Sequence, residues 1–144
     1  MRYSSSYFYL EYYTHAIKVA LSTKQADRAR FVLTETLTAW PRFDNYNLIQ
    51  DIVNLNCDDL RFAILHTYED KENYPDFKDI HTEHIVFMLD KLYVATDCLI
   101  EVFEVGVLPY NPTYSAKIFF MRLCGDMLRY QLHVCYCNLV IFFI

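Results

Sequence analysis

The amino-acid sequence predicts an all-α protein, an antiparallel bundle of about five helices. Only 2 glycines and 4 prolines occur in 144 residues, and so few chain-breaking residues are typical of long helices, because sandwiches and barrels need many glycine-rich turns. Apolar residues also recur with a helical period along most of the chain. With 54% hydrophobic and 22% charged residues, the chain is expected to bury a core of its own.

Two helices are predicted before Pro41. The first covers about 5–21, where aromatic and aliphatic residues recur with helical period. Ser22 and Gln25 have the spacing of a capping box, so the second helix is expected to cover about 23–39 with Ser22 as its N-cap. Pro41 then ends this helix, because a proline disfavours the helical conformation of the residue before it.

Three further helices follow in the prediction. The third covers about 44–72, and the fourth covers about 79–104, with Gly106 and Pro109 expected to end it. Asn111 is expected to be the N-cap of the fifth, with Pro112 at its first helical position. The fifth helix has a wide apolar face, whose central stripe is Ile118, Met121, Gly125 and Leu128 and which is widened by Phe119, Leu123, Phe120 and Met127.

A polar cluster accompanies this stripe. Arg122, Asp126 and Arg129 are separated by four and three residues, so they share one face of the helix, and Tyr130 lies beside them. Such a cluster is either a solvated row of ion pairs or a site in which Asp126 positions the arginines for an anion. The spacing is compatible with both interpretations.

The remaining chemistry excludes several classes of protein. A net charge of −5 and no basic stripe argue against nucleic acid. No nucleophile elbow, phosphate-binding glycine loop or catalytic carboxylate pair is found, so neither an enzyme nor a cofactor is predicted. His81 and His84 lack a third ligand and are interpreted as part of a charge cluster at a helix start, not as a metal site.

The cysteines and the N-terminal residues indicate in which cellular compartment the protein is expected. Five cysteines are present, and their odd number and irregular spacing do not indicate a disulfide framework. The first residues lack the long apolar core of a secretory signal, so a reduced, cytoplasmic setting is expected.

Residues 135–144 are predicted to form an apolar tail beyond a helical domain of residues 1–134. Its apolar run is far below the roughly 20 residues that a membrane span needs.

A family resemblance begins in the fifth predicted helix. Residues 117–130 resemble the fifth helix of 14-3-3 proteins, which reads Lys-Val-Phe-Tyr-Leu-Lys-Met-Lys-Gly-Asp-Tyr-Tyr-Arg-Tyr. The residues that match without a gap are Lys117, Phe119, Gly125, Asp126, Arg129 and Tyr130. The likeness is weaker but collinear over most of the chain. It implies a non-enzymatic adaptor that binds phosphoserine or phosphothreonine in phosphorylated client proteins.

The resemblance also implies a binding site. In the family, the Arg-Tyr pair of the fifth helix binds the phosphate, which here assigns Arg129 and Tyr130, with Arg122 and Asp126 beside them. The family adds a lysine and an arginine seven residues apart on the third helix. An ungapped register from 47–49 places Asn54 and Arg61 at those two positions.

A second register is open for the third helix. If the match is anchored instead on 69–71, two residues drop out and the two positions become Ile52 and Asp59. The ungapped register is preferred, because deleting two residues inside a helix rotates its face by about 200°.

Two differences from the family predict weakened phosphate recognition. Asn54 stands where the family has a lysine, and the helices that complete the family's groove follow the fifth of its nine helices, where this chain stops. We therefore expect a truncated member. Its apolar tail is expected to pack on the bundle, to be buried in a partner, or to replace the family's continuation.

The alternative is a truncated module that only dimerises. In the family, the first helix of one protomer packs on the third and fourth of the other, which implies a homodimer or a heterodimer with 14-3-3 proteins. An aromatic-rich face of the first predicted helix fits this role, and its members are Tyr7, Phe8, Tyr9, Leu10, Tyr12 and Tyr13. Filling of the chain's own core by these rings is the competing interpretation. A helical-repeat scaffold unrelated to phosphate is a third class.

Overall fold

The computed structural model describes residues 2–143 and the side chains of residues 9–140. Within this range the chain forms five α-helices and no strand, which confirms the predicted all-α bundle. The helices are α1 (Arg2–Ser22), α2 (Ala26–Ala39), α3 (Tyr46–Asn73), α4 (Lys78–Glu101) and α5 (Tyr114–Phe143). A 3₁₀ turn, η1 (Pro75–Phe77), precedes α4, and a π-helical segment, η2 (Val102–Val107), follows it.

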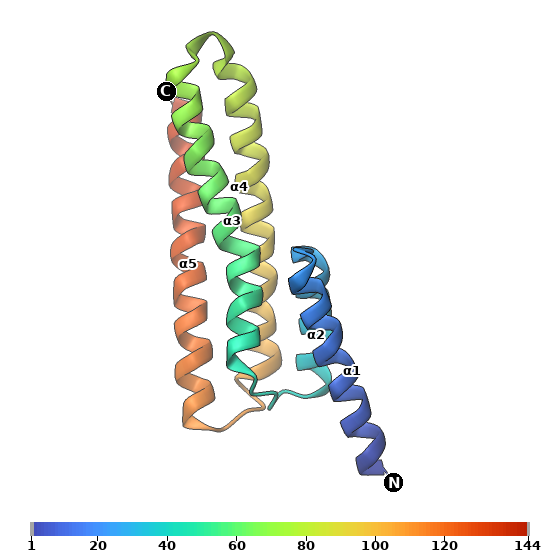
Figure 1. Cartoon of the computed structure of the whole chain (residues 1–144). Coiled ribbons are helices and arrows are strands. Elements are labelled where there is room, and N and C mark those ends of the chain that lie inside the picture. Colours follow the sequence, from blue (N-terminus) through green and yellow to red (C-terminus); the bar gives the residue numbers. More distant parts are fainter. Residues whose placement is uncertain (1, 144) are drawn as a thin grey trace.

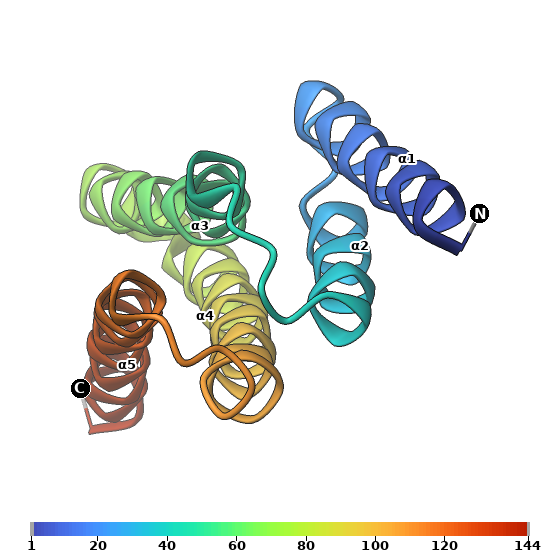
Figure 2. The same ribbon diagram turned by 90° about the horizontal axis from the view of Figure 1, so that it is seen from below.

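The three long helices form the main body of the molecule (Figure 1). Helices α3 and α5 run in the same direction, and α4 runs antiparallel to both. The α1–α2 hairpin packs through α2 on α3 and η2, so α1 lies at one margin and α5 at the other (Figure 2). Helix α5 packs mainly on α4. This arrangement leaves α3 and α5 as neighbours that both rest on α4.

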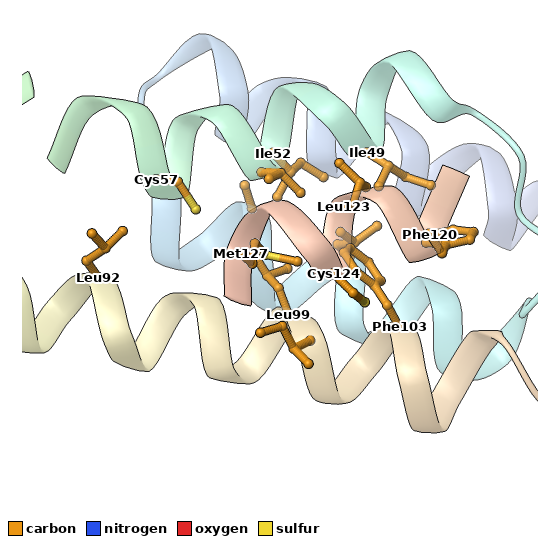
Figure 3. Packing of buried hydrophobic residues seen from close by; sticks show 14 of the residues in the cluster. Ile49, Ile52, Cys57, Leu92, Leu99, Phe103, Phe120, Leu123, Cys124 and Met127 are labelled. Carbon is orange, nitrogen blue, oxygen red and sulfur yellow. The ribbon is translucent and has the colours of Figure 1, made fainter. Parts of the chain in front are cut away.

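The core between these helices is built from aliphatic and aromatic side chains (Figure 3). Phe103 of η2 and Phe120 of α5 are both fully buried, and their ring centroids lie 5.0 Å apart. At the start of α3, Tyr46 stacks on Phe119 with ring centroids 4.4 Å apart. Aromatic pairs of this kind add stabilisation beyond the burial of their area, and they hold the first part of α5 against η2 and against the start of α3.

Only part of the predicted apolar face of α5 faces the core. Ile118, Met121 and Leu128 are exposed, whereas Phe120, Leu123, Met127 and Val134 are buried. Helix α5 carries apolar residues on both sides, so its helical period alone cannot select the side that faces the core. In the structure, the side of α5 that carries Phe120 faces the core, and Phe120 packs there on Phe103.

The predicted capping box before α2 is also wrong, because these residues end α1. The Gln25 backbone N–H donates to the Ala20 carbonyl at 2.9 Å, and the Lys24 N–H donates to the Leu21 carbonyl at 3.1 Å. This is a Schellman motif, in which Lys24 takes the left-handed conformation with φ of 58°. The Ser22 hydroxyl donates to the Val19 carbonyl instead of capping the next helix.

Of the helix ends predicted for the later helices, one is confirmed and others are wrong. Asn45 caps α3 by accepting from the Leu48 N–H at 3.3 Å, close to the predicted start of this helix. The α-helical part of α4 ends at Glu101, and η2 then continues past the predicted end through Gly106 without a left-handed residue. Asn111 is not the cap of α5, since the Ala116 N–H donates to the Thr113 hydroxyl.

The buried Asn111 has another role. Its amide donates to the Pro41 carbonyl at 3.3 Å, and its carbonyl accepts from the Thr113 hydroxyl at 2.8 Å. The loop before α5 is therefore tied to the α2–α3 connector. Helix α5 then continues without a break to Phe143, so residues 135–143 extend the same helix, with Cys137 buried and Leu139 exposed.

Candidate functional site

A pocket of about 580 Å³ opens between α3 and α5, within the size range of small-ligand sites. Helices α3 and α5 form its walls, and Leu92 of α4 lines it from below. Its α3 wall consists of Arg61, Ile64, Leu65 and Tyr68, and its α5 wall consists of Arg129, Tyr130, His133, Tyr136, Cys137 and Val140. One end of the pocket therefore carries two guanidiniums, and the rest is mainly apolar and aromatic.

The contact between Arg61 and Tyr130 joins the two walls. The guanidinium carbon of Arg61 lies 4.2 Å from the centroid of the Tyr130 ring, which is a cation–π geometry. Arg61 also forms an ion pair of 3.5 Å with Asp58, one turn earlier on α3. About half of the Arg61 side chain is exposed, so its guanidinium is held at the pocket while remaining accessible to a ligand.

Arg129 reaches the same pocket from α5. It forms an ion pair with Asp126, three residues earlier on the helix, and most of its side chain is exposed. Each arginine thus has an aspartate on its own helix that orients it. Ion pairs as exposed as these contribute little energy, so an anionic ligand can replace the aspartate as the partner.

Two of the three phenols of the pocket, Tyr68 and Tyr130, have raised pKa values and stay protonated at neutral pH. Burial raises the pKa of Tyr130, an effect that the positive charge of Arg61 partly offsets. Burial raises the pKa of Tyr68 to about 12, with further increases from the Cys137 thiol and its hydrogen bond. Both hydroxyls are therefore available as hydrogen-bond donors to an anion over the physiological range.

The structure brings together three of the residues that the sequence singles out. Arg61, Arg129 and Tyr130 line one pocket, and Asp126 pairs with Arg129 at its edge. Arg122 is exposed but does not line the pocket, because it lies about two turns before Arg129 on α5. The sequence therefore predicts the cationic end of the site without its other walls.

Asn54 lies elsewhere. It lines a separate shallow groove near Lys24 and accepts a hydrogen bond of 2.9 Å from Gln50. Of the two residues given by the second register for α3, Ile52 is fully buried in the core and Asp59 lines grooves on the α2 side. Of the two residues given by the ungapped register, Arg61 lines the pocket and Asn54 does not.

Sequence reasoning did not include Tyr68, His133 and Tyr136, which complete the pocket. Tyr68 follows Arg61 by seven residues, and His133 and Tyr136 follow Arg129 by four and seven. These intervals place each residue on the same helix face as its arginine, so the spacing could have identified them once the two arginines were chosen.

The other candidate ligands do not converge. Among the residues that the structure describes, no group of three or more histidine, cysteine and acidic side chains is arranged to hold a metal ion. His81 is half-buried, and its Nδ1 atom has no hydrogen-bond partner in the described range. No helix of this range is both long and apolar enough to cross a membrane.

Comparisons with known proteins leave the family open. No protein-family model, no curated protein and no solved structure matches the chain.

Proposed function

We propose that this protein is a non-enzymatic adaptor, similar to 14-3-3 proteins, that binds phosphoserine or phosphothreonine in client proteins. The observation that carries the proposal is the pocket shared by Arg61, Arg129 and Tyr130. These residues come from two helices, and the resemblance of residues 117–130 to the family points to the same arginine–tyrosine pair. One line of support is the position of these side chains in the structure, and the other is the amino-acid sequence of α5.

The chemistry of a phosphoryl group fits this pocket. The group carries a charge of about −1.5 to −2 and three acceptor oxygens. Each guanidinium offers a planar fork of donors, and the Tyr130 hydroxyl offers one more. The apolar lining beyond the arginines suits the aliphatic part of a peptide, because it buries apolar surface next to the anion.

Binding by this pocket is expected to be weaker than that of a site with three cations. Asn54 stands in another groove and adds neither charge nor donor to the pocket. Asp58 and Asp126 must also give up their ion pairs before the arginines can turn fully to a phosphate. Both effects lower the affinity without changing which chemical group the pocket selects.

Titration of a labelled phosphoserine peptide against its unphosphorylated twin tests the proposal. The phosphorylated form is expected to bind more tightly, and Arg61→Ala and Arg129→Ala are each expected to weaken it. A charge-assisted hydrogen bond is worth about 1.5–3 kcal/mol, which corresponds to a loss of roughly 10-fold or more. Arg28→Ala, on the exposed surface of α2, is the matched control. Equal binding of the two peptides would reject phosphate recognition.

A second candidate function, dimerisation through α1, has one observation in its favour. Tyr12 and Val19 of α1 are exposed, and α1 lies at the margin of the molecule (Figure 2). Tyr13 instead packs on Trp40, with ring centroids 5.7 Å apart. The side chains of Tyr7 and Phe8 lie outside the described residues. Exposed apolar residues that cluster on one helix are typical of an interface.

Sedimentation velocity at micromolar concentration tests this candidate. The wild-type chain is expected to sediment as a dimer, and Tyr12→Glu is expected to yield monomers because it places a charge in the interface. Glu35→Gln on the exposed surface of α2 is the control that should still dimerise. A wild-type monomer throughout the concentration range would exclude dimerisation through α1.

A further inference from the structure

Helix α5 carries a second apolar face that points away from the bundle. Its positions alternate in steps of three and four residues over the whole helix, as in a heptad repeat. The members of this face, which we term the outer seam, are Ile118, Met121, Gly125, Leu128, Leu132, Cys135 and Leu139. All seven are exposed. Leucine, isoleucine and methionine occupy five of the seven positions.

The exposure of the outer seam is large and continuous. Its five large aliphatic side chains are between 46% and 70% exposed. Helix α5 stands at the edge of the molecule, with α4 and α3 on its inner side (Figure 2). The seam extends over roughly 32 Å, at about 1.5 Å per residue. Contiguous apolar surface of this extent marks an interaction site on a folded protein.

The spacing of the outer seam selects a helix as the ligand. A strict repeat of 3.5 residues per turn keeps an apolar stripe in contact with a second helix that winds around it. Gly125 lies near the middle of the seam, and a Cβ placed there would meet no atom of the described structure within 4 Å. The seam therefore has a central notch that a large side chain of a docked helix can fill.

The charges beside the seam determine which helix fits. Lys117, Arg122 and Arg129 occupy the positions that flank a heptad seam, where partner choice is set by charge. Neither Lys117 nor Arg122 forms an ion pair with any residue that the structure describes. In a parallel pair of two copies Lys117 would face Arg122, and in an antiparallel pair centred on the seam Arg122 would approach Arg129. A second copy therefore opposes like charges in both orientations.

We propose that the outer seam binds an amphipathic helix of a partner protein whose apolar heptad positions are flanked by acidic residues. The apolar side chains supply the driving force, and carboxylates beside Lys117 and Arg122 supply the selection. The proposal goes beyond phosphopeptide binding, because Met121 and Arg122 do not line the phosphate pocket. Arg129 lies between the two surfaces.

Two designed peptides test the proposal. Each has about four heptads with isoleucine and leucine on the seam, and one carries glutamate and the other lysine at the flanking positions. Fluorescence anisotropy with trace amounts of labelled peptide measures binding to the full chain. The glutamate peptide is expected to bind about 10-fold more tightly or better, because several flanking charge pairs are attractive with glutamate and repulsive with lysine. The preference should shrink as salt is added.

Substitutions on the seam separate this proposal from the phosphate site. Met121→Glu and Arg122→Glu are each expected to weaken the glutamate peptide about 10-fold. Met121→Glu leaves the phosphoserine peptide unaffected, and circular dichroism confirms that it folds. Arg61→Ala should give the reverse pattern, so the two proposals can fail independently.

Three results would overturn the proposal. The first is equal binding of the glutamate and lysine peptides, which removes the charge selection. The second is no binding of either peptide. The third is a dimer of the chain that Met121→Glu abolishes, which would assign the seam to a second copy of this protein.

Discussion

At the residue scale, Arg61 shows how a guanidinium can be held in position by its neighbours and still be free to bind an anion. Its guanidinium carbon lies over the Tyr130 ring, and a guanidinium carries five N–H donors that can serve other partners. The ion pair with Asp58 involves the Nη1 end of this group. An anion that enters the pocket therefore meets a guanidinium that is already oriented, which reduces the entropy lost on binding.

Buried acidic side chains predict how stability depends on pH. Burial raises the pKa of Cys57 from 9.0 to about 12 and that of Cys124 from 9.0 to about 11. The pKa of Tyr68 is raised from 10.0 to about 12. The native chain then holds protons that the unfolded chain has lost, so the free energy of unfolding is intact below about pH 9 and falls as the pH rises toward 12.

Urea unfolding across this range measures the effect. The midpoint is expected to stay level from about pH 7 to 8 and to decrease from about pH 9 upward. The Cys57→Ala/Cys124→Ala variant removes two of the responsible groups, so its midpoint should decrease less steeply. An identical slope for the variant and the wild type would contradict the assignment to these thiols.

At the element scale, helix ends show how local signals compete. Ser22 and Gln25 fit a capping box, yet the chain uses them to close α1 through the backbone bonds of a Schellman motif. Gln25 then becomes the N-cap of α2, without a side-chain capping bond to any described residue. Both arrangements draw on the same few residues, and the hydrophobic packing of α1 on α2 decides between them.

Lys24 supplies a prediction at this scale. It occupies the left-handed position of the motif, where glycine is preferred because a Cβ costs about 1–2 kcal/mol. Lys24→Gly is therefore expected to raise the free energy of unfolding by about 1 kcal/mol, after the greater flexibility of glycine in the unfolded chain is subtracted. Urea denaturation checks this, with Lys24→Ala as the control that keeps the Cβ. A less stable glycine variant would contradict the motif.

Helix α5 shows what the helical period of apolar residues can and cannot predict. Its spacing predicts a helix, which the structure confirms, and Arg129 and Tyr130 of this helix line the pocket. The side facing the core could not be predicted, because Phe120, Leu123 and Met127 form one apolar stripe and Met121, Leu128 and Leu132 form another. Only the contacts with α4 and η2 distinguish the stripes. The exposed stripe is thus a property of the assembled fold.

At the scale of the whole molecule, the pocket depends on how three helices are placed. Helices α3 and α5 run in the same direction over α4 (Figure 1), which puts Arg61 and Arg129 at one opening. The sequence could predict each helix from its period and most connectors from their prolines. It could not predict that Asn54 lies in another groove, because that depends on where the end of α1 and the α1–α2 turn meet α3.

Three surfaces of the whole molecule lie apart from one another. The pocket opens between α3 and α5, the outer seam follows the free side of α5, and the exposed residues of α1 lie at the opposite margin (Figure 2). A client bound at the pocket would leave the α1 face uncovered. An adaptor with such a layout can hold a phosphorylated client while it contacts a second protein.

A double-mutant cycle of Arg61→Ala and Arg129→Ala, measured as affinity for the phosphoserine peptide, tests the central claim most directly. If both guanidiniums bind one phosphate, the double variant should lose less than the sum of the single losses, with a coupling of roughly 0.5–3 kcal/mol. The unphosphorylated twin should show no coupling. Losses that add to within about 0.3 kcal/mol would show independent sites and contradict the claim.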